Sequence, residues 1–248
     1  MHWIQSWDTA LFRFINDTLA NPVFDQLMPF ASGNKFFMPA GVVAAVLLAW
    51  KGGRRGRLCL LMLALIVGPG DGLVINTLKH AFARPRPFVG QQHVRFLGVK
   101  TTPATTAGFN GIADPEHPIA APRNHNSMPS AHAANCFAAT MILLVYYRRS
   151  WRFLLPLAGT VAFSRVYNGV HYPSDVLVGA ILGAGYAAAG MWALNSLWRW
   201  AGRNWFPLWW EKLPSLVNPE FNSQQPTINT ESLHAVIHAR ECDRASQR

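Results

Sequence analysis

Two histidines and one aspartate are placed where they could carry nucleophilic and acid–base chemistry. Asp175 follows His171 by four residues. A carboxylate at that spacing can hold one nitrogen of the imidazole ring and direct the other outward, which makes His171 a candidate nucleophile. His132 is then the candidate acid that protonates the leaving group.

Three cations, Lys79, Arg86 and Arg165, accompany these groups in the sequence. Brought together, they would repel one another unless an anion lay between them, and arginine and lysine side chains suit phosphate oxygens. Ser130 follows Pro129 and precedes an apolar run, so we expect it to cap a helix whose free backbone N–H groups point at the same anion. The combination predicts a phosphate-binding site.

The elements that must position these side chains are apolar. Half of the 248 residues are hydrophobic and only 14% are charged, whereas about a quarter is usual in soluble domains. This composition excludes a disordered chain, a coiled coil and a collagen-like repeat. Apolar runs cover residues 36–50, 58–78, 133–147, 153–163 and 176–198. We expect membrane-spanning helices there, although the shorter runs fall below the about 20 residues that a span needs.

Alternation of these spans places the polar residues on one side of the membrane. The polar clusters cover residues 79–87, 129–132 and 164–175, each next to an expected span. Because successive spans cross in opposite directions, all three clusters are expected at the same membrane face. Asp71, inside the second run, is expected to be paired within the bundle, and Lys79 is one candidate partner.

Residues 3–28 have a different pattern. Apolar side chains recur at helical spacing, while Asp8, Asp17 and Asp25 take the other face. This pattern predicts an amphipathic helix that lies at the membrane interface and is broken at Asn21-Pro22. The alternative is a sixth span, which would bury the three aspartates in the membrane.

Basic loops indicate an orientation. Residues 51–57, residues 148–152 and the tail from Arg199 are basic and lie on one side, which the positive-inside rule makes cytoplasmic. The other side carries cations of its own, and those that bind phosphate should not count in this rule. In the tail, His234 and His238 have a spacing that a metal site can use, but two exposed histidines on a short helix are the simpler interpretation.

The three motifs together resemble the signature of a known family, the type 2 phosphatidic acid phosphatase (PAP2) superfamily. The resemblance covers residues 36–199 and includes both the order of the motifs and their internal spacing. Ala131 departs from the family pattern, because glycine is most usual at that position. The motifs read Lys79-x6-Arg86-Pro87, Pro129-Ser130-Ala131-His132 and Ser164-Arg165-x5-His171-x3-Asp175.

The resemblance implies a metal-independent phosphatase whose helical-bundle core is shared with vanadium haloperoxidases. It implies that His171 attacks phosphorus and forms a phosphohistidine, that Asp175 orients His171, and that His132 protonates the leaving oxygen. No cofactor is expected, which agrees with the lack of a carboxylate cluster suited to a hard cation. The residues that the resemblance assigns to phosphate binding are Lys79, Arg86, Ser130, Ala131 and Arg165.

Similar proteins act on undecaprenyl diphosphate, phosphatidylglycerophosphate, phosphatidic acid or lipid A phosphates. We therefore expect a membrane lipid phosphate or diphosphate as substrate, with Arg123 as a candidate second-phosphate or headgroup contact. The net charge of +10 indicates a phosphate-bearing partner, here the lipid bilayer and its lipids and not nucleic acid. A lipid phosphotransferase that uses the same site, a non-enzymatic lipid transporter and an inactive scaffold are the alternatives.

The sequence thus predicts an all-α, polytopic membrane protein with a PAP2-type bundle of five to six transmembrane helices. Residues 1–30 form the amphipathic helix, residues 31–201 the membrane phosphatase domain with an outer loop at 88–128, and residues 202–248 a soluble, partly flexible tail. The expected location is a bacterial inner (plasma) membrane, with the site facing the periplasm or outside and the tail in the cytoplasm. The oligomeric state is left open.

Overall fold

The computed structural model of the chain describes residues 2–91, 93–97, 111–113 and 126–217. The chain divides into two compact units, Met1–Ser196 and Leu197–Arg248. The candidate site residues that the structure describes belong to the first unit. Arg123 and the tail histidines lie outside the described residues.

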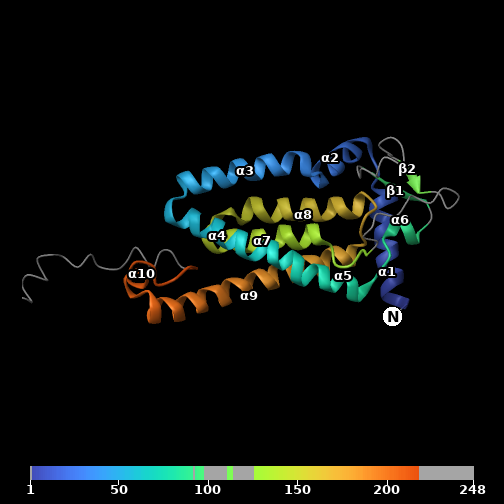
Figure 1. Ribbon diagram of the computed structural model, residues 1–248. Coiled ribbons are helices and arrows are strands. Elements are labelled where there is room, and N and C mark those ends of the chain that lie inside the picture. The colour runs from blue at the N-terminus through green and yellow to red at the C-terminus, as the bar shows by residue number, and fades with distance from the viewer. Residues whose placement is uncertain (1, 92, 98–110, 114–125, 218–248) are drawn as a thin grey trace, which may run out of the picture. The chain divides into compact units, whose positions relative to one another are not determined.

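Five apolar stretches of the sequence are helical, as predicted. In the first unit α7 packs against α4 and α8, α3 packs against α4, and Figure 1 shows these helices following a common direction. The helices are Asn34–Lys51 (α3), Gly53–Gly70 (α4), Ala131–Tyr146 (α7), Trp151–Tyr167 (α8) and Pro173–Trp205 (α9).

The helix that begins with α4 continues beyond Gly70. A π-helical turn, Asp71–Ile75 (η2), joins α4 to Asn76–Phe82 (α5), so that one helix runs from Gly53 to Phe82. Pro69 lies in the last turn of α4, and its missing N–H interrupts the regular hydrogen-bond ladder. The wider π turn accommodates this interruption, and the helix carries Lys79 to its far end.

Two helices, Gly53–Phe82 and Pro173–Trp205, are long and apolar enough to cross a membrane. The helical segments Met38–Lys51 and Ala131–Tyr146 are apolar but shorter. Many large apolar side chains on the helices are exposed. Such a surface is rare in a water-soluble monomer and suits contact with lipid. Examples of exposed side chains are Val42, Val46, Leu65, Phe153, Ile181 and Trp192.

The N-terminal segment consists of His2–Arg13 (α1), a π-helical turn at Phe14–Thr18 (η1) and Pro22–Ser32 (α2). The side chain of Asn21 accepts a hydrogen bond from the backbone N–H of Phe24 (2.9 Å) and caps α2. The predicted break at Asn21-Pro22 is therefore confirmed. Helix α2 packs against α8, and Figure 1 shows α1 running across the direction of the bundle helices.

The face of α1 that carries Asp8 and Phe12 faces the protein. Asp8 is 7% exposed, and Asn16, in η1, is fully buried. Trp7, Leu11 and Phe14 are exposed instead. These exposed apolar side chains are unusual for a surface helix of a water-soluble domain, whose apolar stripe faces the core.

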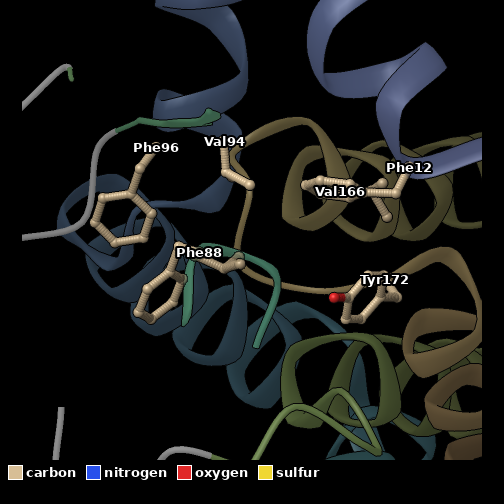
Figure 2. Packing of buried hydrophobic residues seen from close by; sticks show 7 residues of the cluster. Phe12, Phe88, Val94, Phe96, Val166 and Tyr172 are labelled. Atoms are coloured by element: carbon tan, nitrogen blue, oxygen red, sulfur yellow. The ribbon is translucent and has the colours of Figure 1, made fainter. Parts of the chain in front are cut away.

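A small apolar core lies at the end of the bundle that α1 crosses. Phe12 of α1 contacts the ring of Tyr172 (centroids 5.5 Å apart), and Phe88 contacts Phe96 (4.7 Å) (Figure 2). Val170 joins this cluster from the loop between α8 and α9. The core therefore fixes that loop, which carries His171, against α1 and against the segment that carries Phe88, Val94 and Phe96.

The chain between α5 and α7 contributes short elements. Pro87–Gly90 forms α6, and Val94–Phe96 (β1) pairs antiparallel with Gly111–Ala113 (β2), with Val94 opposite Ala113. This ribbon is a small exception to the predicted all-α structure. A 3-10 turn, Arg148–Ser150 (η3), precedes α8, and in the second unit Pro207–Lys212 forms α10.

Two glycines bring α9 close to the start of α7. A Cβ atom at Gly179 would meet the backbone of Ser130, and one at Gly183 would meet the carbonyl oxygen of Ala134. Only glycine leaves room for this approach, which fits the small-xxx-small spacing of tightly packed membrane helices. The close contact determines where the first turn of α7 lies.

Candidate active site

The structure brings together side chains from all three polar clusters. Lys79 lies in the last turn of α5, Arg86 follows that helix, and Arg165 lies in the last turn of α8. His132 lies in the first turn of α7. All three cations and His171 are close enough to His132 to act on it electrostatically. The elements thus converge on one site at one end of the bundle.

His171 and Asp175 form the buried centre of this site. His171 is 2% exposed and Asp175 is fully buried. Nδ1 of His171 lies 3.7 Å from Oδ2 of Asp175, which is longer than a hydrogen bond. The same Oδ2 accepts hydrogen bonds from the hydroxyl of Ser127 and from the backbone N–H of Tyr172, the latter at 2.8 Å. These two bonds therefore hold the carboxylate beside the imidazole ring, although it makes no hydrogen bond to the ring in this structure.

The surroundings of His171 favour its neutral form. Burial lowers its pKa from 6.5 to about 4, and the nearby Arg165 and Arg86 cations act in the same direction. The nearby carboxylate of Asp175 raises the pKa but does not offset burial. The ring is therefore neutral at pH 7, and a neutral imidazole is the form that can act as a nucleophile.

We expect the His171 ring to remain neutral from pH 7 down to about pH 4. NMR titration of the full chain with 13C-labelled histidine would follow it, and the resonance missing from His171→Gln would identify it. Because the unfolded chain takes up the proton near pH 6.5, the folded state should lose stability as the pH falls from there. A midpoint near the ordinary histidine value would contradict the buried, cation-flanked position.

The cations of the site carry buried donors without acceptors. Lys79 and Arg165 are each 8% exposed. The Nε atoms of Arg86 and Arg165 have no hydrogen-bond partner among the described residues, although Nη1 of Arg165 donates to the hydroxyl of Ser32. Burial lowers the pKa of Arg86, and the charge of Asp175 opposes this effect. Buried, unsatisfied donors with positive charge fit an anionic ligand.

Ser130 lies at the expected helix start but does not cap the helix with its side chain. Helix α7 begins at Ala131, and the Ser130 hydroxyl is buried without a partner in the described part of the chain. The backbone N–H of Ser130 donates to the carbonyl oxygen of Asp175 (2.9 Å). The hydroxyl and the first-turn N–H groups, beginning with that of Ala131, are therefore available to an anion.

The site contains four further side chains that the sequence does not assign to it. Arg84 bonds to Asp175, Ser127 bonds to the same carboxylate, and Ser32 bonds to Arg165. Asp8 of α1 pairs with Arg84. Two sequence features could have indicated these residues. Acidic side chains occur on α1, and Arg84 and Ser127 lie within or next to the motifs at residues 79–87 and 129–132. Among the described residues Asp71 forms no ion pair with Lys79, and its Oδ1 has no hydrogen-bond partner.

Comparisons with known proteins identify the family of the chain. A family model described as the PAP2 superfamily matches residues 57–199. A lipid A 4'-phosphatase of Bacteroides thetaiotaomicron is 27% identical over 186 residues, which cover 74% of this chain and 75% of that protein. The bacitracin transport permease protein BcrC of Bacillus licheniformis is 28% identical over 193 residues, 75% of this chain and 80% of that protein.

A solved structure has the same fold. The chain resembles a transmembrane PAP2-type phosphatidylglycerolphosphate phosphatase from Bacillus subtilis with a TM-score of 0.50 and 20% identity. The similarity covers 79% of this chain and 89% of that one. The family match and the phosphatases among the relatives define a phosphatase of the integral-membrane type. The family match extends over more than half of the sequence, and the chain belongs to the PAP2 superfamily.

Proposed function

We propose that the protein removes a phosphate from a membrane lipid phosphate or diphosphate through a phosphohistidine intermediate. The observation that carries this proposal is a buried His171 beside Asp175, close to His132 and to the three cations that act on His132, at one end of an apolar helical bundle. That set of groups can bind a phosphate and attack it. The phosphatase names of several relatives support the same activity.

In the first step Nε2 of His171 attacks phosphorus. A P–N bond forms while the bond between phosphorus and the leaving oxygen breaks. His132, which takes up a proton when the phosphate anion binds and offsets the surrounding cations, donates that proton to the leaving oxygen. Asp175 accepts a hydrogen bond from Nδ1–H and stabilises the positive charge that develops on the ring. The 3.7 Å separation of Nδ1 and Oδ2 must shorten for this bond to form.

In the second step water attacks the phosphohistidine. His132, now neutral, takes a proton from the water, the P–N bond breaks, and inorganic phosphate leaves. Lys79, Arg86 and Arg165 hold the three phosphate oxygens in both steps, assisted by the Ser130 hydroxyl and the first N–H groups of α7. Fixed positive charge in a water-poor site stabilises the transition state without reorganisation. The proposed reaction uses no metal ion.

The membrane arrangement belongs to the same proposal. Helices α3, α4–α5, α7, α8 and α9 would cross the bilayer, while α1 would lie at the interface with Trp7, Leu11 and Phe14 towards lipid. The site would then lie at headgroup level, facing the periplasm of a bacterial inner membrane, with residues 202–248 in the cytoplasm. A lipid phosphate could reach the cations without leaving the membrane.

We expect hydrolysis to persist in EDTA and to be inhibited by vanadate. The purified protein in detergent would be assayed for released phosphate with undecaprenyl diphosphate, phosphatidylglycerophosphate, phosphatidic acid and a lipid A phosphate. Vanadate adopts the five-coordinate geometry of phosphorus in the transition state, so it should occupy the cation site. Loss of activity in EDTA that magnesium or zinc restores would overturn the metal-free mechanism.

The same assay separates hydrolysis from group transfer. A phosphotransferase would use the same phosphohistidine but pass the phosphate to a second lipid. Substrate labelled in its phosphate would release label as inorganic phosphate in a hydrolase. Label that moves to an added acceptor lipid would instead establish the phosphotransferase. Lipid movement with no loss of label from the substrate would favour the transporter.

A further inference from the structure

A continuous set of hydrogen bonds connects α1 to the carboxylate of Asp175. Arg84 donates from Nη1 to Oδ1 of Asp175 (2.8 Å) and from Nη2 to Oδ2 of Asp8 (2.6 Å). Ser174 closes the set, because its hydroxyl accepts from Nη1 of Arg84 (2.7 Å) and donates to Asp8 (2.6 Å). The backbone N–H of Ser174 donates to Oδ1 of Asp8 (2.9 Å).

Both carboxylates are out of reach of bulk solvent. Asp175 is fully buried, Asp8 is 7% exposed, and the guanidinium of Arg84 lies 4.0 Å from the ring centroid of Tyr172. Burial lowers the pKa of Arg84, but the charges of Asp175 and Asp8 and their hydrogen bonds outweigh it, so the pKa is raised. Arg84 therefore stays charged between two carboxylates, and breaking either pair would leave a buried charge uncompensated.

The contacts divide the Asp175 carboxylate into two ends. Oδ1 is held by Arg84, whereas Oδ2 is the atom nearest to Nδ1 of His171. Rotation of the carboxylate would break the bond to Arg84. Arg84 therefore fixes the direction in which Oδ2 points, and Asp8 fixes Arg84 from the opposite side.

We infer that Asp8 and Arg84 are positioning residues for His171, and that α1 is in this way part of the active site. The inference rests on the proposed role of His171 and Asp175. Asp8 also has an electrostatic effect, since it shares the positive charge of Arg84. Without Asp8, that charge would act on Asp175 alone and weaken its support for the developing positive charge on His171.

A merely structural role for Asp8 would be to hold the N-terminal segment in place. The chain offers a matched contact of that kind. Asp25 of α2 accepts two hydrogen bonds from Nη2 of Arg95 (2.8 and 2.7 Å) and one from the hydroxyl of Tyr167 (2.6 Å). This ion pair also joins the N-terminal segment to the rest of the unit, but neither partner contacts Asp175.

The experiment compares Asp8→Asn with Asp25→Asn in the full-length chain, beside wild type and His171→Ala. An asparagine at position 8 has the size of aspartate but would place an amide N–H against Arg84 or Ser174. We expect Asp8→Asn to lower kcat on the order of 10²-fold, the loss typical of a displaced reacting group. Its KM and the inhibition constant of inorganic phosphate, which report on the three cations, should stay within about threefold of wild type. Asp25→Asn should keep kcat within the same narrow range.

Ser174→Ala is a second variant that tests the same inference if Asp8→Asn fails to fold. It removes one contact to each of Asp8 and Arg84 but keeps their ion pair, so we expect a several-fold loss of kcat with an unchanged melting temperature. Wild-type kcat in both Asp8→Asn and Ser174→Ala would overturn the inference. Equal losses in Asp8→Asn and Asp25→Asn, with weakened phosphate binding in both, would also overturn it. Full activity of His171→Ala would instead refute the proposed function.

Discussion

Replacement of His171 by alanine should abolish phosphate release. If this imidazole forms the covalent intermediate, no other described histidine lies beside a carboxylate and could replace it. We expect kcat to fall by about 10⁴–10⁶-fold, the range seen when a nucleophile or its activating group is removed. The measurement is released phosphate from the best lipid of the panel at saturating concentration.

Acid-quench labelling makes this test more specific. Wild-type protein mixed with phosphate-labelled substrate should retain label on the chain, and His171→Ala should retain none. His80→Ala is the matched control, because His80 follows the buried Lys79 on α5 but its own side chain is exposed. Label on His171→Ala, or more than a few per cent of wild-type turnover, would remove His171 as the nucleophile.

Local features of the site were predictable from the sequence because they depend on neighbouring residues. A spacing of four residues brings Asp175 beside His171, with Nδ1 and Oδ2 3.7 Å apart. The start of α7 next to Ser130 follows from Pro129 and the apolar run after it. The helix break before α2 follows from Asn21-Pro22, since the asparagine caps the next helix. Each of these features is set within one or two turns of chain.

Long-range partners were not predictable in the same way. The sequence around Arg84 does not indicate its carboxylate partners, because they lie 76 residues before it and 91 residues after it. Burial of such a pair depends on how α1 packs, which no local pattern encodes. The role of Ser127 could not be predicted for the same reason, since its hydroxyl donates to a carboxylate 48 residues further along the chain.

The orientation of α1 illustrates a further limit. Helical periodicity shows that Trp7 and Leu11 lie on one face and Asp8 on another, but it does not say which face meets the protein. In water the apolar face would be buried. Next to a bilayer the apolar face can meet lipid, and the polar face is then free to bond with polar groups of the same chain. In the structure Trp7 and Leu11 are exposed, whereas Asp8 is buried and pairs with Arg84.

The effect of His132→Ala should depend on the leaving group. A lipid alkoxide is a poor leaving group and needs a proton as the bond to phosphorus breaks, whereas a nitrophenolate needs it much less. If His132 is the acid, its removal should slow hydrolysis of an alkyl phosphate by about 10²–10⁴-fold, the usual contribution of acid–base catalysis. An activated aryl phosphate should be affected far less in its first step.

Arg165→Ala supplies the contrast that separates chemistry from binding. Arg165 is 8% exposed and its Nε has no partner among the described residues, so we expect it to contact phosphate oxygens that both substrates share. Its removal should therefore slow both substrates by similar factors. Each comparison uses one protein preparation and two substrates, so a partial folding defect cancels in the ratio. Single-turnover rates isolate the first step, in which the leaving group departs. Equal losses for both substrates in His132→Ala would show that this side chain binds phosphate or supports the start of α7 and is not the acid.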